Sequence, residues 1–336
     1  MSSKINIVIP SIELSEELIY CLTQLNNQIY KNFFVTIVLD FDNKKKLPKL
    51  RYKLNTLISN KENMSYKRNL GVKKFQSDLI AFLDSDAYPH KNWLKIAEGF
   101  LSKKINANTI FGGPSIPFPN QSYTEMLCHF AKRSFYVTGY LNFRKYKSKS
   151  RYCDWIESCC MFMQRALYLK HGGMNEKKYL GEDKELIERI KKNDNSLKVF
   201  FTSKLFIHHK ERNIKKFLLQ KVVFGSDIFN IMKFGNEIRA FQPILPFLVT
   251  FSFISLMFIN IEVETKYLLM LVFVTLIQLI IFIDVRKYLK GLKKTILTMM
   301  LINFANLAFT MGNIIALLGV KNFMNKKAYL KSRHNK

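Results

Sequence analysis

The chain has 336 residues and a formal net charge of +28, with 53 Lys and Arg residues against 25 Asp and Glu residues. Because a domain usually holds roughly 100 to 200 residues, this length is enough for one sizeable domain and an appendage. The basic residues cluster beside apolar segments and form no recognised nucleic-acid-binding motif, so we expect a membrane surface as a partner and no nucleic acid.

The N-terminal region has the pattern of a βαβ unit. Two short β-branched runs, at 5–10 and 33–39, predict buried parallel strands, and residues 16–28 between them have helical spacing. Such a unit places its ligands at the carboxyl ends of the strands, where Asp40 and Asp42 stand. The apolar run at the start is too short for a signal peptide, so we expect this α/β domain in the cytosol.

A further strand ends in two carboxylates. Residues 63–75 predict a helix and residues 79–83 an apolar strand, which stops at Asp84 and Asp86. Hard oxygen ligands suit Mg²⁺ or Mn²⁺, and such an ion would bridge the diphosphate of a nucleotide. A lone D-x-D is more often a solvated turn, but its position directly after a buried strand favours a metal site.

The second half of this domain offers three further candidates. Gly113, in a Phe-Gly-Gly-Pro turn, is a candidate substrate contact. Glu182 and Asp183 open a helix that runs to about residue 192, where an acidic pair is favoured by the helix dipole and could equally be a cap without chemistry.

A last strand, predicted over 199–207, ends at two histidines. We take His208 as a candidate metal ligand. The alternatives are His209 in its place, a phosphate contact, or a packed or exposed histidine without such a role. The five cysteines show no C-x-x-C spacing, and the adjacent pair Cys159 and Cys160 has no histidine partner nearby in sequence. We therefore expect these two to be small buried residues, in a reducing compartment.

The C-terminal third has the composition of a membrane region. An amphipathic connector is expected over 211–242, followed by apolar segments at 244–261, 267–283 and 296–320, each near the roughly 20 residues that span a bilayer. The acidic turn between the first two and the basic turn between the last two fit a cytosolic catalytic domain. Three full spans would put the basic tail outside, unless the third segment is re-entrant or bent, and this point stays open.

Four segments resemble glycosyltransferase family 2, whose members have the GT-A fold. The strongest is KRNLGVKKFQSDLIAFLDSDAYPHKNWL at 67–94; the others are INIVIPS at 5–11, VLD at 38–40 and HGGMNEKKYLGEDKELIERI at 171–190. Together they cover about 5–210. The resemblance implies a mostly parallel sheet flanked by helices, followed here by a transmembrane helical region.

The resemblance also assigns roles to residues. It implies that Asp40 lines the base and ribose pocket with Pro10 and Ser11, and that Arg68 and Asn69 help to hold the nucleotide. Asp86 would be the main metal ligand, and Asp84 would contact the ribose or the metal. Asp183 matches the catalytic base that takes a proton from the acceptor hydroxyl, with Glu182 as the alternative, and the in-line displacement implies inversion at the anomeric carbon.

We therefore predict a catalytic domain over 1–210, a connector over 211–242 and a transmembrane region over 243–336. The predicted protein is a multi-pass protein of the cytoplasmic membrane, a metal-dependent hexosyltransferase of cell-envelope glycan assembly that moves a sugar from a nucleotide-diphosphate sugar to a lipid-linked or saccharide acceptor. A polyprenyl-phosphate sugar synthase is one alternative. A polysaccharide synthase is disfavoured because the run at 220–224 lacks the Arg and Trp of a Q-x-x-R-W motif. A non-catalytic scaffold with a vestigial nucleotide site is the alternative from another class.

Overall fold

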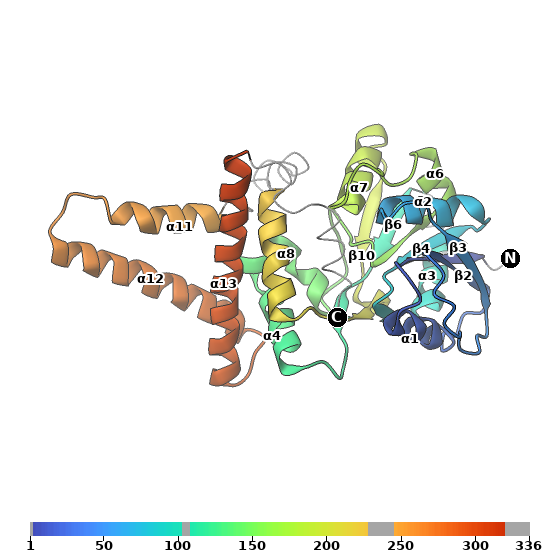
Figure 1. Cartoon of the computed structure of the whole chain (residues 1–336), viewed down its shortest axis with the longest axis horizontal. Coiled ribbons are helices and arrows are strands. Elements are labelled where there is room, and N and C mark those ends of the chain that lie inside the picture. The colour runs from blue at the N-terminus through green and yellow to red at the C-terminus, as the bar shows by residue number, and fades with distance from the viewer. Residues whose placement is uncertain (1–2, 103–107, 228–244, 320–336) are drawn as a thin grey trace. The chain divides into compact units, whose positions relative to one another are not determined.

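The structure is a computed structural model and describes residues 3–102, 108–227 and 245–319 (Figure 1). It divides the chain into two units, one made of 1–118 with 143–210 and the other of 119–142 with 211–336. The segment 119–142 therefore groups with the C-terminal residues, although it lies inside the range predicted for the first domain. We describe each unit by itself.

The first unit is built on an eight-stranded sheet. Its strands, in the order in which they lie side by side, are β3 (Lys53–Ile58), β2 (Phe33–Leu39), β1 (Ile5–Pro10), β4 (Leu79–Leu83), β9 (Cys160–Gln164), β6 (Thr109–Gly112), β10 (Lys198–Phe201) and β8 (Arg151–Tyr152). The first four are parallel to one another, and β9 runs antiparallel to both of its neighbours. Strands β1, β2 and β4 are buried along their whole length, because helices cover both faces. The predicted α/β, mostly parallel sheet is confirmed.

Two hydrophobic layers hold the helices to this sheet. The helices of the unit are α1 (Glu16–Leu25), α2 (Met64–Lys74), α3 (Trp93–Ser102), α6 (Arg165–Lys170) and α7 (Glu182–Asn193). Side chains of α1 and α3 share one core with alternate residues of β1, and those of α2, α6 and α7 share the other. Figure 1 shows α1 and α2 on opposite faces of the sheet. Successive side chains of β1 point to opposite faces of the sheet, so β1 contributes residues to both layers.

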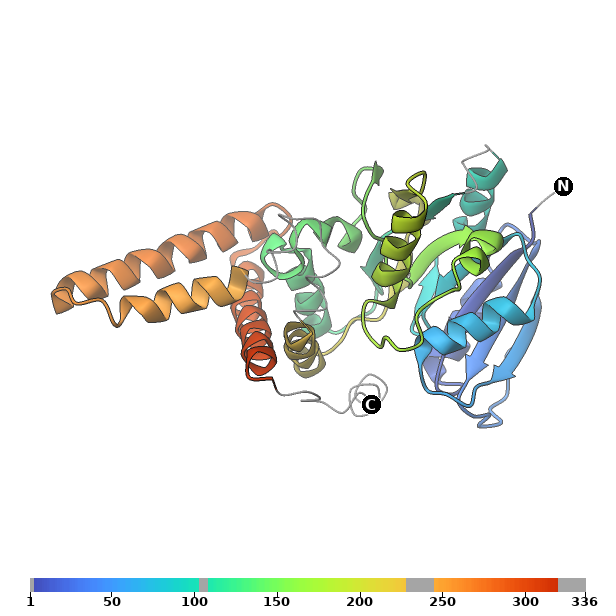
Figure 2. The same ribbon diagram turned by 90° about the horizontal axis from the view of Figure 1, so that it is seen from above.

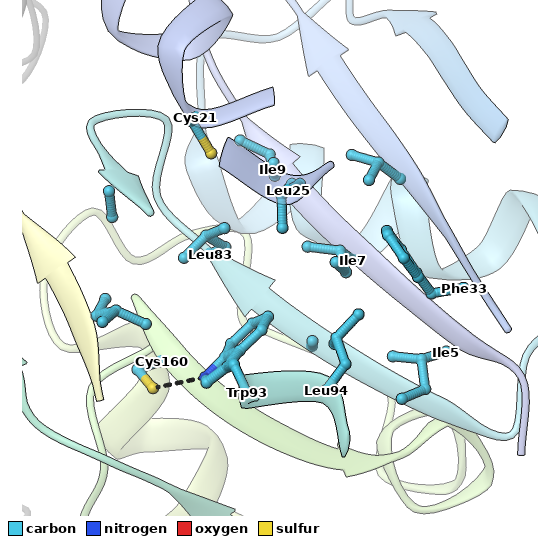
Figure 3. Close-up of a cluster of buried hydrophobic side chains, with 14 of the residues drawn as sticks. Ile5, Ile7, Ile9, Cys21, Leu25, Phe33, Leu83, Trp93, Leu94 and Cys160 are labelled. Atoms are coloured by element: carbon cyan, nitrogen blue, oxygen red, sulfur yellow. Dashed lines mark hydrogen bonds between the residues drawn. The ribbon is translucent and has the colours of Figure 1, made fainter. Parts of the chain in front are cut away.

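The adjacent cysteines belong to this packing, as predicted. In Figure 3 the indole N–H of Trp93 donates to the Cys160 sulfur at 3.4 Å, in the middle of the core. Burial raises the pKa of the Cys160 thiol to about 12 and that of Cys159 well above its usual value. Neither thiol has the thiolate character that a nucleophile needs.

A small second sheet corrects the predicted last strand. The apolar run near residue 200 is divided between β10 of the main sheet and β11 (Ile207–His209), with a short 3₁₀ turn between them. β11 lies between β5 (Ala87–Pro89) and β7 (Ser115–Pro117). It pairs antiparallel with β5, and the register sets His209 opposite Ala87, next to the D-x-D turn.

The second unit is helical. Its helices are α4 (Tyr123–Arg133), α5 (Phe135–Thr138), α8 (Ile214–Ser226), α11 (Leu245–Leu256), α12 (Val263–Arg286) and α13 (Leu292–Leu317). Helix α13 packs along α8, and their backbones meet at Gly225 and Gly312, where an added Cβ on Gly312 would lie 2.2 Å from the Val222 carbonyl oxygen. Such close approach requires glycine.

Two helices of the described ranges, α12 and α13, are long and apolar enough to cross a bilayer by length and composition. The first predicted segment instead contains α11, a helix of 12 residues or about 18 Å, well short of the roughly 20 residues that a span needs. Residues 228–242 of the predicted connector and the basic tail from residue 320 lie outside the described residues.

Candidate active site

Two aspartates and a histidine converge beside the carboxyl end of β4. The Nε2 atom of His209 lies 3.4 Å from Asp86 Oδ1 and 3.6 Å from Asp84 Oδ2. One ligand atom from each residue lies within 4.8 Å of the other two. The register of β11 on β5 creates this cluster, because it holds the end of β11 against the turn that carries both carboxylates.

His208, the histidine chosen from the sequence, does not join this cluster. Its Nδ1 atom lies 2.9 Å from the Pro117 carbonyl oxygen, and its ring stacks on Tyr88 at 4.8 Å between centroids. Successive side chains of a strand point to opposite faces, so only one of the two histidines can face the carboxylates. That residue is His209.

The residues of the cluster fit a divalent cation. Two carboxylates and one imidazole are accepted ligands of such ions, and the carboxylate oxygens suit Mg²⁺ or Mn²⁺. All three side chains remain partly exposed, with 42% exposure for Asp86, so an ion and a substrate phosphate can reach them. Asp84 and Asp86 therefore occupy the positions that the metal-site prediction requires.

Arg68 connects this cluster to the other acidic pair. Its guanidinium is buried and donates from Nη2 to Asp84 Oδ1 at 3.0 Å and from Nη1 to Glu182 Oε1 at 2.9 Å. Helix α2 supplies the arginine, the end of β4 supplies Asp84, and the first turn of α7 supplies Glu182. One cation thus joins carboxylates that are about 100 residues apart in the chain.

Asp183, next to Glu182, is held in place by backbone groups. The Ser158 amide donates to its Oδ2 atom and the Lys184 amide to its Oδ1 atom, both at 2.8 Å. Burial, and then the charge of Glu182, raise the pKa of Asp183 to about 7. A carboxylate with this pKa can accept a proton near neutral pH.

A buried lysine contacts two of the predicted nucleotide-binding residues at the carboxyl ends of β1 and β2. Lys67 has no solvent exposure, and its Nζ atom lies 2.7 Å from Asp40 Oδ1 and donates to the Ser11 carbonyl at 2.6 Å. The Ser11 amide in turn donates to the Val38 carbonyl, and Pro10 is the buried last residue of β1. Pro10, Ser11 and Asp40 therefore lie together at the carboxyl ends of β1 and β2.

Asn69 and Gly113, the remaining predicted substrate contacts, both make close contacts within the protein. The Asn69 amide nitrogen donates to the Met174 carbonyl and to Glu176, and its oxygen accepts from the Met174 amide and the Tyr168 hydroxyl. These bonds use all the hydrogen-bonding capacity of the side chain, which leaves none for a nucleotide. Gly113 is pressed against backbone, since an added Cβ would lie 2.3 Å from the Leu205 carbonyl oxygen.

The sequence analysis missed a second ion-pair cluster in this unit. Lys145 donates to both carboxylate oxygens of Glu157, at 2.8 and 2.9 Å, and Arg144 lies 3.6 Å away. Burial opposes ionisation, yet Lys145, Arg144 and the nearby His209 hold the pKa of Glu157 at about 2. Glu157 precedes Ser158, the residue whose amide holds Asp183.

Comparisons with known proteins show what this chain is similar to. A sequence model described as Glycosyl transferase family 2 matches residues 6–171. The Glycosyltransferase AglE of Haloferax volcanii is 25% identical over 125 residues, which are 34% of this chain and 41% of that protein. The Amylovoran biosynthesis glycosyltransferase AmsB of Erwinia amylovora is 38% identical over 99 residues, which are 27% of this chain and 33% of that protein. The matches thus span about a third to two fifths of these relatives.

A solved structure shares the fold. The Mannosyltransferase PcManGT from Pyrobaculum calidifontis, in complex with GDP-Man and Mn²⁺, superimposes with a TM-score of 0.57 at 12% identity. The alignment covers 96% of this chain and 89% of that chain. At this level of identity the likeness establishes the GT-A type architecture and nothing about the substrate.

Proposed function

We propose that the chain is a member of glycosyl transferase family 2, whose sequence model matches residues 6–171, and that it transfers a sugar from a nucleotide-diphosphate sugar to an acceptor hydroxyl. The observation that carries the proposal is the Arg68 bridge. It joins Asp84, in the candidate metal cluster, to Glu182, the neighbour of the candidate base Asp183. The two parts of a transferase site, leaving-group side and acceptor side, are thus linked through one side chain.

On the donor side, Asp84, Asp86 and His209 would hold the divalent ion. Bound there, Mg²⁺ or Mn²⁺ offsets the negative charge that develops on the departing diphosphate. Lys67 fixes Asp40 and the Ser11 carbonyl as a rigid edge for the base and ribose. The mannosyltransferase with the same fold was solved with GDP-Man and Mn²⁺, a donor and an ion of the classes proposed here.

On the acceptor side, Asp183 would act as the general base. It removes the proton of the acceptor hydroxyl while the oxygen attacks the anomeric carbon from the face opposite the diphosphate, so the anomeric configuration inverts. The Ser158 and Lys184 amides keep both carboxylate oxygens in fixed positions. Glu182 is unsuited to this task because its Oε1 atom already accepts a hydrogen bond from Arg68.

We further propose that the acceptor is lipid-linked, that the product belongs to cell-envelope glycan assembly, and that the catalytic unit faces the cytosol at the cytoplasmic membrane. The long apolar helices α12 and α13 support a membrane location, where a lipid acceptor is available. The name of the relative AmsB refers to amylovoran biosynthesis, a glycan-forming activity of that protein.

The test uses membranes that contain the full-length protein and a panel of labelled nucleotide sugars, with Mn²⁺ or with a chelator. We expect label from one donor to enter the lipid-extractable fraction, only with the metal, and this transfer to be lost in Asp183→Asn and retained in His208→Ala. If the label is found in a polyprenyl-phosphate sugar or in a polymer, the proposed acceptor is wrong and that product identifies the alternative synthase. Donor binding without turnover in any acceptor fraction would instead identify a scaffold.

A further inference from the structure

Helix α12 is apolar and exposed all round. From Tyr267 to Ile277 every residue except Thr275 is apolar, and none of them is buried. Only Ile281 and Val285, in the last two turns of α12, are buried. A helix that is apolar on every side needs an apolar medium on every side.

Beyond its first turn, which also exposes Lys293 and Lys294, helix α13 is exposed along one stripe. The stripe follows helical spacing and is entirely apolar, and its residues are Ile296, Met300, Phe304, Leu307, Met311, Ile314 and Leu317. The opposite side of α13 is buried and carries small and polar residues, among them Thr298, Ala305 and Gly312. This helix packs on protein through one side and needs an apolar medium only on the other.

The two helices run in different directions. Figures 1 and 2 both show α11 and α12 side by side, projecting from α13 on the side opposite α8. Two consecutive membrane spans would lie roughly antiparallel, whereas α12 crosses α13. At the crossing, the side-chain amides of Gln278 and Asn303 donate to each other at 3.3 and 3.0 Å, which fixes the base of the hairpin.

We propose that the α11–α12 hairpin inserts into the lipid bilayer while α13 lies along the bilayer surface with its apolar stripe in contact with lipid. This proposal rests on the membrane location of the proposed function. The projecting part of α12, Val263–Ile280, has 18 residues and a length of about 27 Å, close to the roughly 30 Å of a hydrocarbon core. The turn with Glu262 and Glu264 therefore reaches the opposite headgroup layer.

The charges at the two ends of the hairpin support this arrangement. Its base carries five exposed cations, which are Arg286, Lys287, Lys290, Lys293 and Lys294. They lie where α12 leaves the bilayer and α13 begins, in reach of anionic headgroups. Cationic turns stay on the cytosolic side, so the hairpin base and both ends of α13 are placed there. The third apolar segment is then no span, which removes the conflict over the basic tail.

Spin labels at the middle of each helix test the proposal. The full-length protein, with the partly exposed Cys153 replaced by serine, receives a label at Val272→Cys or at Leu307→Cys, both exposed sites, in phosphatidylcholine–phosphatidylglycerol vesicles. Accessibility to oxygen and to a water-soluble nickel chelate then gives the depth of each label. We expect the Val272 label near the bilayer centre, about 15 Å from the hydrocarbon boundary, and the Leu307 label within about 5 to 10 Å of the headgroups.

Three results would overturn the proposal. Two labels at equal, central depth would show two spans, and two labels exposed to water would show no insertion. Labels shielded from both reagents would show that a second copy of the chain covers these helices. Sugar transfer is measured on the same vesicles, and its result does not depend on the depth of the labels. Absent transfer would contradict the proposed function, whereas wrong label depths would contradict the proposed membrane arrangement.

A second measurement determines on which side of the membrane each end of the hairpin lies. A membrane-impermeant maleimide should react with Asn260→Cys, at the turn of the hairpin, only from the side opposite to the one that labels Lys290→Cys. Both residues are exposed. Labelling of both from one side would contradict a hairpin that crosses the bilayer.

Discussion

The pH dependence of transfer follows from the surroundings of Asp183. Burial and the charge of Glu182 raise its pKa to about 7, so the carboxylate that accepts the proton is about half ionised at that pH. Below it, each pH unit removes a factor of about ten, which leaves roughly a tenth of the base active at pH 6 and a hundredth at pH 5. We therefore expect log kcat/KM to rise with unit slope up to about pH 7 and then to level off.

The assay is the initial rate of transfer of labelled sugar into the membrane acceptor from pH 5 to 8.5, at saturating Mn²⁺ so that metal binding does not limit the rate. Two variants separate the causes. Asp183→Asn should lower transfer by about 10² to 10⁴-fold at all pH values. Glu182→Gln removes the like charge and should move the break to lower pH. A flat profile between pH 5 and 8, or a break that Glu182→Gln leaves in place, refutes the reasoning.

The raised pKa of Asp183 also makes the free energy of unfolding depend on pH. The folded pKa of Asp183 lies above its unfolded value of about 3.9, so the folded state binds the proton more tightly. Its contribution is fully present below about pH 4 and is lost as the pH rises through 7, by roughly 4 kcal/mol in all. Relative to wild type, Asp183→Asn should therefore gain thermal stability between pH 5 and 8, and an unchanged difference in Tm would contradict the buried carboxylate.

Three further substitutions probe other parts of the molecule. His209→Ala should weaken Mn²⁺ binding by at least about tenfold in a titration, whereas His208→Ala leaves it unchanged; equal effects would place the metal elsewhere. Gly312→Ala puts a Cβ 2.2 Å from an α8 carbonyl oxygen and should lower the free energy of unfolding by about 1–3 kcal/mol. The control Gly99→Ala has no atom within 4 Å of the new Cβ and should leave the free energy of unfolding unchanged or raise it. An unchanged stability of Gly312→Ala would disprove the close helix contact. Lys67→Met removes the cation that faces the half-buried Asp40 and should lower the free energy of unfolding by about 1–3 kcal/mol in urea titrations, with weaker donor binding. Wild-type stability would show that the pair is dispensable.

The central strands could be predicted from the sequence to the residue. The runs at 5–10, 33–39 and 79–83 coincide with β1, β2 and β4, because strands buried on both faces need continuous apolar, β-branched sequence. Strand β3 (Lys53–Ile58) was missed, since it lies at the edge of the sheet and all its residues are exposed or half-buried. Its sequence carries no comparable hydrophobic signal.

The site was predictable only where local pattern fixes geometry. Asp84 and Asp86 follow a buried strand, so their place at the sheet edge follows from β4 alone. The choice between His208 and His209 depends on the register of a three-residue strand against β5, which no local pattern encodes. Lys67 and Glu157 were missed because charged residues are usually solvated. The burial of Lys67 and the ion pairs of Glu157 are evident only when their partners are in place.

The single guanidinium of Arg68 serves two carboxylates that belong to opposite sides of the proposed reaction. Removing either Asp84 or Glu182 changes the charge balance felt by the other. Kinetic defects of the two single variants therefore cannot be summed, and a double-mutant cycle across this pair should yield a coupling energy even though the two residues do not touch. Separating effects on the proposed donor from effects on the proposed acceptor therefore requires that Arg68 be kept constant.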